Sequence, residues 1–379
     1  MDSIAQGRFA IVGAGLMGRL LAVELAQAGG QVDLYDQGGP DAALSAARVA
    51  AAMLAPLAES AITENNVVNM GVHSLSRWPE IIAKLASPVF FQKNGSLILW
   101  HRQDANDAER FIKHLQKNQR SNPALTAPEM LDSARLLEIE PSVADRFNQG
   151  LYLPNEGQLD NRQLLNALAI ELSTLPVNVY WHQTPEPQAL EQSGRYDWVI
   201  DSRGLGAKSD WPEAKGNSLR GVRGEVIRLY APEVNLLRPT RLIHPRYPIY
   251  IAPKENHIYV VGATEIESDD HSEMSVRSAM ELLSAVYTVH SGFAEARILE
   301  MATQCRPTLK NNLPEVRIEN GAGSTKRLSI NGLYRHGFMI APAILDSVIE
   351  LLISGSSHTA KKLGLNVADT SMNQVAACA

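Results

Sequence analysis

The sequence predicts an α/β fold interleaved with a second, mostly antiparallel β-domain, and three observations carry this prediction. Strand, glycine-rich turn, helix and strand occupy the first 36 residues. Short strands without intervening helices fill much of the middle, and a strand, a glycine turn and a helix return near the C-terminus. Strands alternating with helices are typical of a parallel sheet, whereas a run of strands is typical of an antiparallel domain.

The N-terminal unit follows from its hydrophobic spacing. Residues 9–12 (FAIV) form an apolar strand that runs into the glycine turn 13–18 (GAGLMG) and then into a helix at 20–28. Two glycines end this helix, and residues 31–35 form a second strand that ends at Asp36. The first 36 residues therefore form one complete βαβ unit.

The turn has the GxGxxG spacing of a dinucleotide-binding site. Gly13 permits the tight turn, Gly15 lets the backbone approach a pyrophosphate, and Gly18 lets helix and strand pack closely. Asp36 follows Gly15 by 21 residues, close to the roughly 20 expected for an acid that binds a ribose hydroxyl. We predict a Rossmann-type site, with FAD and NAD both open from this motif alone.

Further elements follow along the chain. The alanine-rich residues 45–58 favour either a helix as far as Pro56 or a backbone that lies close against a flat ligand. Strands at 89–91 and 96–100 are joined by a hairpin-type turn at 93–95 (KNG). Other predicted strands are 177–181, 197–201, 224–229, 249–252, 258–261 and 328–330; predicted helices are 104–119, 161–172, 274–290, 343–353 and one beginning at 64.

Composition excludes several classes of function. The 379 residues are 45% hydrophobic, enough for a large core, and 35 basic against 41 acidic residues give no basic stripe for nucleic acid. Cys305 and Cys378 lie far apart without a CxxC, which argues against a disulfide framework or a metal site and fits a reducing cytoplasm. Neither a signal peptide nor a stretch of roughly 20 apolar residues is evident, so we expect a cytoplasmic protein outside the membrane.

Three residues in the second half are candidates for substrate binding: Tyr250, Arg306 and Arg335. An amino-acid oxidase needs a cation that grips the substrate carboxylate, and arginine does so with a planar fork that a tyrosine hydroxyl can assist. Hydride transfer to a flavin then needs neither a nucleophile nor a metal. Beside Arg335, we expect His336 to serve packing or backbone contact instead of acting as a general base.

Together these residues resemble the D-amino-acid-oxidase superfamily of FAD-dependent oxidoreductases, and within it the glycine oxidases of bacterial thiamine biosynthesis. The resemblance runs from about residue 9 to 352. Residues 50–59 (AAAMLAPLAE) are similar to an Ala-Ala-Gly-Met-Leu run that lies along the flavin in that family. Residues 306–307 (RP) and 334–342 (YRHGFMIAP) are similar to the family's closing segments.

The resemblance implies noncovalent FAD and oxidation of glycine by O2 to an imine, with release of hydrogen peroxide. The imine hydrolyses to glyoxylate and ammonia or passes to thiazole synthesis, which makes thiazole synthase a candidate partner; a homo-oligomer is also expected. Sarcosine and D-alanine remain alternative substrates, and a dehydrogenase that reduces a quinone remains an alternative to an oxidase.

The resemblance also implies roles for single residues. Arg306 and Tyr250 would hold the carboxylate, with Arg335 at the border of the substrate. The residues expected to contact FAD are Gly13, Gly15, Leu16, Met17, Gly18, Asp36, Gln37, Ala46, Ala47, Ala51, Ala52, Met53, Leu333, Tyr334, His336, Gly337, Phe338 and Met339. The expected FAD-binding parts are 1–85, 146–220 and 306–365, the substrate-domain parts are 86–145 and 221–305, and 366–379 is a tail.

Four positions depart from the family pattern or bear on it. Ala52 stands where the family often has glycine, Glu265 where some members have methionine, and Pro248 where some have histidine. Glu265 could select the substrate amino group or narrow the cavity. Cys305 raises the covalent flavin attachment of sarcosine oxidases but is shifted from that position, so we expect dissociable FAD.

Overall fold

The computed structural model describes residues 2–213, 216–243 and 249–369, so Pro248, Cys378 and most of the predicted tail lie outside the described residues. After a short helix α1 (Asp2–Ala5), the predicted βαβ unit is confirmed as β1 (Arg8–Val12), α2 (Leu16–Gln27) and β2 (Gln31–Asp36). The two strands run parallel, with Val12 opposite Tyr35.

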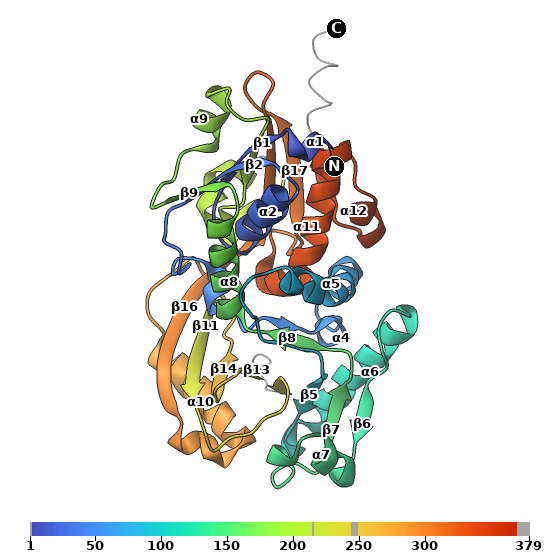
Figure 1. Ribbon diagram of the computed structural model, residues 1–379. Helices are drawn as coiled ribbons and strands as arrows, with labels where there is room; N and C mark the ends of the chain where they lie inside the picture. The colour runs from blue at the N-terminus through green and yellow to red at the C-terminus, as the bar shows by residue number, and fades with distance from the viewer. Residues whose placement is uncertain (1, 214–215, 244–248, 370–379) are drawn as a thin grey trace.

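A seven-stranded sheet extends this unit in both directions. Its strand order is β19-β17-β18-β10-β1-β2-β9, parallel apart from the antiparallel pair β17–β18. The added strands are β9 (Val177–Trp181), β10 (Trp198–Asp201), β17 (Glu315–Asn320), β18 (Lys326–Asn331) and β19 (Asn366–Asp369). In Figure 1 this sheet and its helices form the upper half of the molecule, and β10 lies between the blue N-terminal strands and the orange C-terminal ones.

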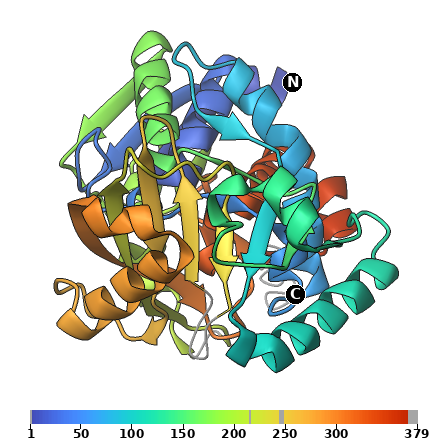
Figure 2. The same cartoon turned by 90° about the horizontal axis from the view of Figure 1, so that it is seen from below.

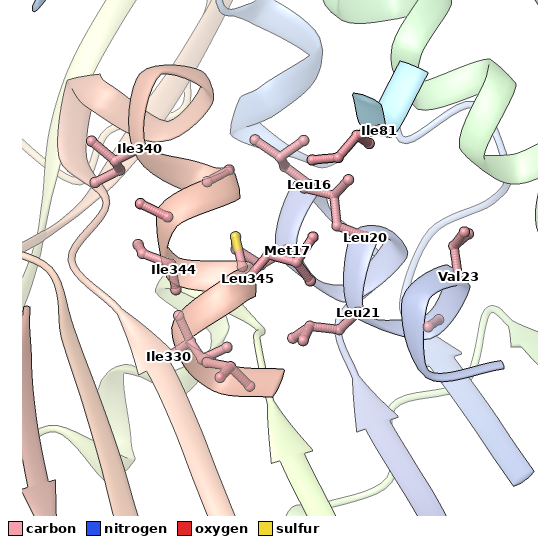
Figure 3. Close-up of a cluster of buried hydrophobic side chains, with 14 of the residues drawn as sticks. Leu16, Met17, Leu20, Leu21, Val23, Ile81, Ile330, Ile340, Ile344 and Leu345 are labelled. Atoms are coloured by element: carbon pink, nitrogen blue, oxygen red, sulfur yellow. The ribbon is translucent and has the colours of Figure 1, made fainter. Parts of the chain in front are cut away.

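Helices cover this sheet on both faces. On one side lie α2, α5 (Asn65–Ala83), α8 (Asn161–Thr174), α11 (Gly337–Ser354) and α12 (His358–Leu363), and α9 (Pro187–Gln192) packs against β10. Figure 3 shows the core between α2 and α11, where Met17 and Leu21 face Ile344 and Leu345. Burial of these apolar side chains is the main stabilising contribution here.

The helical stretch Tyr334–Ser354, which contains α11, is long and apolar enough to cross a membrane by length and composition. The sequence predicted only its second half, residues 343–353, and no apolar stretch of this length. In the structure it is a core helix: Ile340 and Ile344 are fully buried, and the helix packs along α5 and α2.

A nine-stranded, mostly antiparallel sheet forms the lower half, as predicted for the middle of the chain. Its order is β15-β11-β14-β13-β12-β5-β7-β6, and β16 pairs with β11. The bounds are β5 (Ser96–Leu99), β6 (Glu129–Leu131), β7 (Gly150–Leu153), β11 (Leu219–Tyr230), β12 (Thr240–Leu242), β13 (Ile249–Pro253), β14 (Ile258–Gly262), β15 (Ile266–Glu267) and β16 (Arg297–Leu309). Figure 2 shows α10 (Val276–Val289, orange) and α6 (Ala105–Ser121, teal) at opposite ends of this sheet. Helix α7 (Ser133–Ile139) packs against β6.

A small sheet joins the two halves and overturns two expectations. Its strands are β3 (Met53–Leu54), β8 (Gly157–Leu159) and β4 (Phe91–Gln92). The predicted hairpin at 93–95 is therefore wrong, since β4 pairs with β8 while β5 pairs with β7 in the large sheet. A continuous helix over 45–56 is also wrong: α3 (Ala46–Val49) and α4 (Pro56–Glu59) flank an extended segment.

Further segments differ from expectation. Strands β16 and β17 were not predicted, and α11 begins at Gly337 instead of residue 343. Residues 366–369, assigned to the tail, form β19 beside β17. The two large sheets draw on alternating stretches of chain, while the domain limits themselves stay a prediction.

Candidate functional site

A cavity of about 550 Å³ lies where the two large sheets meet. Its lining comes from distant parts of the chain: the glycine turn before α2, residues 44–53, the face of the nine-stranded sheet, and the segment that leads into α11. Every residue predicted to contact cofactor or substrate lines this cavity except Gly18. The roles assigned to them remain predictions.

The glycine turn is shaped by close backbone approach. Gly13 has φ 100°, and a Cβ there would lie 2.7 Å from the backbone carbon of Ser202, at the end of β10. Gly18 faces inward, because a Cβ there would collide with the carbonyl of Gly13. Gly18 therefore packs the helix against the turn, which is the role that the motif gives its third glycine, and it leaves Gly15 to line the cavity.

Asp36 is fixed at the end of β2 by two backbone amides. Its carboxylate accepts from Ala14 N at 2.5 Å and from Gly38 N at 2.6 Å. Beside it, the N-terminus of α2 presents Leu16 and Met17 to the cavity. The positive end of a helix together with a ribose-binding acid suits the diphosphate and ribose of a dinucleotide.

Residues 50–53 form an extended wall of the cavity, which we call the alanine wall. Ala51 and Ala52 are almost fully buried, and Ala52 has φ 52°, a left-handed conformation that favours glycine. Small side chains let the wall backbone lie close to a flat ligand.

The opposite wall is one face of the nine-stranded sheet. Arg241, Tyr250, Gly262 and Val226 are successive cross-strand partners on β12, β13, β14 and β11, so their Cβ positions share one face. Gly262 makes room for the tyrosine ring, since a Cβ there would lie 2.8 Å from the Tyr250 hydroxyl oxygen. Burial raises the pKa of Tyr250, against the opposing effect of nearby arginines, so its hydroxyl is a neutral donor.

Arg306 extends this face on β16. It lies opposite Val222, and Gln304 lies opposite Gly224. The guanidinium of Arg306 donates from Nη1 and Nη2 to the carbonyl of Thr264 at 3.2 Å, and from Nη1 to the carbonyl of Arg223 at 3.2 Å. Two backbone carbonyls thus orient the fork without neutralising its charge.

Glu59 and Arg335 build a buried ionic cluster at the same end of the cavity. Glu59 binds Arg241 Nη2 at 2.7 Å, Arg335 Nη2 at 3.1 Å and His336 Nε2 at 3.0 Å. Burial alone would raise the pKa of Glu59, but Arg335, Arg241 and the bond from His336 hold it well below its ordinary value. Arg335 also binds Glu265 at 2.9 Å, and Glu265 accepts from the Tyr334 hydroxyl.

His336 is buried, and burial lowers its pKa, opposed by Glu59. Nε2 of His336 lies 3.0 Å from Glu59 Oε2 and 3.4 Å from Arg335 Nε. With the proton on Nε2, a neutral His336 donates to Glu59, and that nitrogen is then not a proton acceptor.

Four arginines line the cavity: Arg203, Arg241, Arg306 and Arg335. Arg203 binds Asp201 and Asp210, and Arg241 and Arg335 bind Glu59. Among the residues that the structure describes, Arg306 is the one of these four with no carboxylate partner. A guanidinium held by carbonyls alone at a cavity wall is suited to an incoming carboxylate.

Sequence reasoning did not single out Glu59, Arg241 or Gln304 as site residues. Arg241 and Glu59 are 182 residues apart, and no spacing rule connects them. No local signal marked Arg241, because residues 240–242 were not predicted to form a strand.

Cys305 points away from the cavity face. Its neighbour Arg306 lies on that face, and side chains alternate along a strand. The thiol contacts the carbonyls of Ser268 at 3.5 Å and Asp270 at 3.3 Å, on the opposite side of the sheet. Cys305 is among the residues that line the cavity, but its thiol is turned toward these two carbonyls.

A dinucleotide-type turn lies at one end of the cavity, and an oriented cation on the same sheet face as a tyrosine lies at the other. This arrangement is that of an oxidoreductase with a dinucleotide cofactor. The chain belongs to the DAO family of FAD dependent oxidoreductases, whose model matches residues 8–348.

Relatives agree with this placement. The chain is 35% identical over 347 residues to a protein of Rhizobium etli described as a putative thiamine biosynthesis oxidoreductase ThiO, covering 92% of this chain and 97% of the relative. It is 24% identical over 356 residues to a glycine oxidase of Geobacillus kaustophilus, covering 88% of this chain and 89% of the relative. The crystal structure of a glycine oxidase from Bacillus cereus superposes with a TM-score of 0.76 at 19% identity, covering 93% of this chain and 96% of that structure, and shows the same fold.

The cavity fits the FAD that this family uses. Two helix N-termini line it, those of α2 and α11, with Gly337 at the start of α11 leaving open space where a Cβ would stand. The diphosphate half suits the α2 end beside Asp36. The flat isoalloxazine ring suits the alanine wall and the N-terminus of α11, whose amides favour the electron-rich end of the ring.

Proposed function

We propose that the protein oxidatively deaminates glycine with FAD and O2, giving an imine and hydrogen peroxide for the thiazole moiety of thiamine. The observation that carries this proposal is Arg306: an oriented guanidinium without a carboxylate partner, on the same sheet face as Tyr250. The similarity to the thiamine biosynthesis oxidoreductase of Rhizobium etli and to the glycine oxidase of Geobacillus kaustophilus supports the pathway and the substrate.

The charges at this end of the cavity support a substrate with one carboxylate. Arg241, Arg306 and Arg335 face two carboxylates, Glu59 and Glu265. One positive charge is left over, and a single substrate carboxylate balances it. A second carboxylate on the substrate would add an uncompensated buried charge, which is costly.

Arg306 and Tyr250 would hold the carboxylate of glycine, with Arg335 at its border. Holding the carboxylate at two points turns the α-carbon toward the cofactor and supplies the orientation on which the rate depends. When bound, FAD would supply the acceptor for the hydride of the α-carbon, and O2 would reoxidise it with formation of hydrogen peroxide. The alanine wall and the buried sheet face exclude water from the substrate during this step.

The amine loses a proton as the carbon loses its hydride, so the product is the imine of glyoxylate. Water converts this imine to glyoxylate and ammonia, or thiazole synthase receives it as a partner. We propose noncovalent FAD, because Cys305 faces away from the cavity. We also propose that the protein is cytoplasmic and forms a homo-oligomer.

Anaerobic reduction of the purified yellow protein tests the function. Glycine should bleach the visible flavin absorption, and admission of O2 should restore it with one hydrogen peroxide per cycle. Sarcosine and D-alanine are the comparison substrates, each assayed with O2 and with a quinone. D-Alanine turning over far faster than glycine, or a flavin that glycine leaves oxidised, would refute the proposal.

A further inference from the structure

Lys254 is a buried lysine directly after β13, and it does not itself line the cavity. Its ammonium donates three hydrogen bonds: to Ala51 O at 2.8 Å, to Leu159 O at 2.7 Å and to Gln158 Oε1 at 3.0 Å. These contacts use all three donors of the side chain. None of the three acceptors is a carboxylate.

These acceptors belong to the alanine wall and to the strand that supports it. Ala51 is part of the wall, and β8 supplies Gln158 and Leu159. The amide of Leu159 donates to the carbonyl of Ala52 at 3.2 Å. Lys254 and β8 therefore fix two successive wall carbonyls, at the point where Ala52 takes its left-handed conformation.

Lys254 also continues the strand that carries Tyr250. Only four positions separate the two residues. Residues 250–253 pair with β14, and residues 249–251 also pair with β12. A displacement of the wall at Ala51 is thus transmitted along a short, stiff stretch to the tyrosine hydroxyl. No other described side chain donates to the carbonyl of Ala51.

Holding an ammonium here is costly. Burial lowers the pKa of Lys254 to about 7, opposed by Asp160, which caps α8, while Arg228 on β11 lowers it further. An apolar side chain would avoid this cost but would leave three buried acceptors without donors. The cost is consistent with a lysine that fixes geometry.

We propose that Lys254 is a positioning residue that locks the alanine wall to the strand of Tyr250, so that binding of FAD and binding of the substrate carboxylate are coupled through it. The inference rests on the proposed function, because it takes the wall as the flavin side and Tyr250 as the carboxylate side.

The test compares full-length wild-type holoenzyme with Lys254→Met, which keeps the length of the side chain and removes its donors. Dilution of each holoenzyme, followed by the fluorescence of released FAD, gives the FAD dissociation constant. Acetate, titrated at saturating FAD and followed by the flavin absorption spectrum, reports the carboxylate site. We expect Lys254→Met to raise the FAD constant at least tenfold and the acetate constant at least fivefold.

Leu229→Ala is the matched control. Leu229 is buried on the same large sheet, against the α10 side, and its truncation lowers thermal stability without touching the wall. Both constants should stay within twofold of wild type in this variant. A parallel rise of both constants in Leu229→Ala would overturn the inference, since general loosening of the sheet would then explain the effect.

Gln158→Leu keeps the inference testable if Lys254→Met does not fold. It removes one of the three acceptors and leaves both carbonyl contacts, so both constants should rise two- to fivefold. If both dissociation constants are unchanged in Lys254→Met or in Gln158→Leu, the inference is overturned and the proposed function is not. The same holds if only the FAD constant rises and the acetate constant does not. Wild-type protein that binds no FAD would overturn the proposed function as well.

Discussion

The backbone of Gly224 lies directly beneath the guanidinium of Arg306. A Cβ at Gly224 would stand 2.5 Å from Arg306 Cζ, too close for any real contact. The two residues lie on neighbouring strands, β11 and β16. The guanidinium of Arg306 occupies the space that a side chain at Gly224 would fill. The absence of a side chain at Gly224 is therefore part of the proposed carboxylate site.

Gly224→Ala should displace Arg306 without disturbing the cofactor. Because a misplacement of about 1 Å can cost on the order of 100-fold in rate, we expect kcat/KM for glycine to fall by roughly 10- to 100-fold. FAD content should stay at wild-type level. Gly150→Ala, on β7 and away from the cavity lining, is the control; an equal loss of kcat/KM there would refute the link to Arg306.

Arg306→Ala should bind FAD and lose the substrate. Hydrogen bonds to charged groups contribute about 1.5–3 kcal/mol, so we expect KM for glycine to rise about 100-fold. Steady-state oxygen uptake with rising glycine measures this. Arg220→Ala serves as control, since Arg220 pairs with Glu267 at the sheet edge. An unchanged KM would remove Arg306 from the carboxylate role.

Ala52→Gly should stabilise the protein. A non-glycine residue in the left-handed region costs about 1–2 kcal/mol, which exceeds the entropic cost of glycine of about 0.5–1 kcal/mol. The melting temperature should therefore rise slightly. Ala51→Gly, next to it, should lower the melting temperature, because no positive φ is relieved there. Equal shifts of the same sign in both variants would contradict this account of Ala52.

Glu156→Gln should change the pH dependence of stability. Burial raises the pKa of Glu156 to about 7, against Arg241, the Ser96 hydroxyl and the amide of Ala58, while Glu59 raises it further. Between pH 4.5 and 7 the folded state therefore binds more protons than the unfolded state, so stability falls as pH rises. The full penalty, at most about 3 kcal/mol, is present above pH 7.

Glutamine carries no such penalty. The melting temperature of Glu156→Gln, measured relative to wild type, should be higher at pH 8 and near equal at pH 4. Glu129→Gln on the surface controls for a general effect of removing a carboxylate. A constant difference between the variant and wild type at both pH values would contradict the assigned pKa direction.

Cys305→Ser should keep its FAD. The thiol faces the carbonyls of Ser268 and Asp270 across the sheet from the cavity. Acid precipitation of wild type and variant should leave a colourless pellet and a yellow supernatant in both cases. Colour retained in the wild-type pellet and lost in the variant would show a covalent bond to sulfur.

The sequence predicted the parts of this fold whose patterns are local. The βαβ unit was found because β1, the glycine turn and α2 follow one another in one continuous stretch of sequence. Strand β16 was missed because apolar as well as polar side chains are largely exposed over its first five residues. The sequence therefore shows no alternation of polar and apolar residues there. The false hairpin at 93–95 has suitable turn residues, but its two strands find better partners in β7 and β8.

The same distinction holds for the site. Tyr250, Arg306 and Arg335 could be named because their residue types and neighbours resemble a known pattern. Glu59 could not be paired with Arg241 and Arg335, because those contacts depend on how α4 and the segment before α11 meet the sheet. Charge balance in a cavity is a property of the folded chain.

The order of strands in the seven-stranded sheet has a consequence for biosynthesis. β1 and β2 leave the ribosome first, but β18, which completes the sheet beside β10, and α11, which covers α2, are made more than 280 residues later. Until then α2 can pack against β2 and α8, but its contact with α11 is missing. A nascent chain arrested before residue 354 would therefore expose the side of α2 that faces α11, and chaperone binding to the N-terminal segment should persist until α11 has emerged.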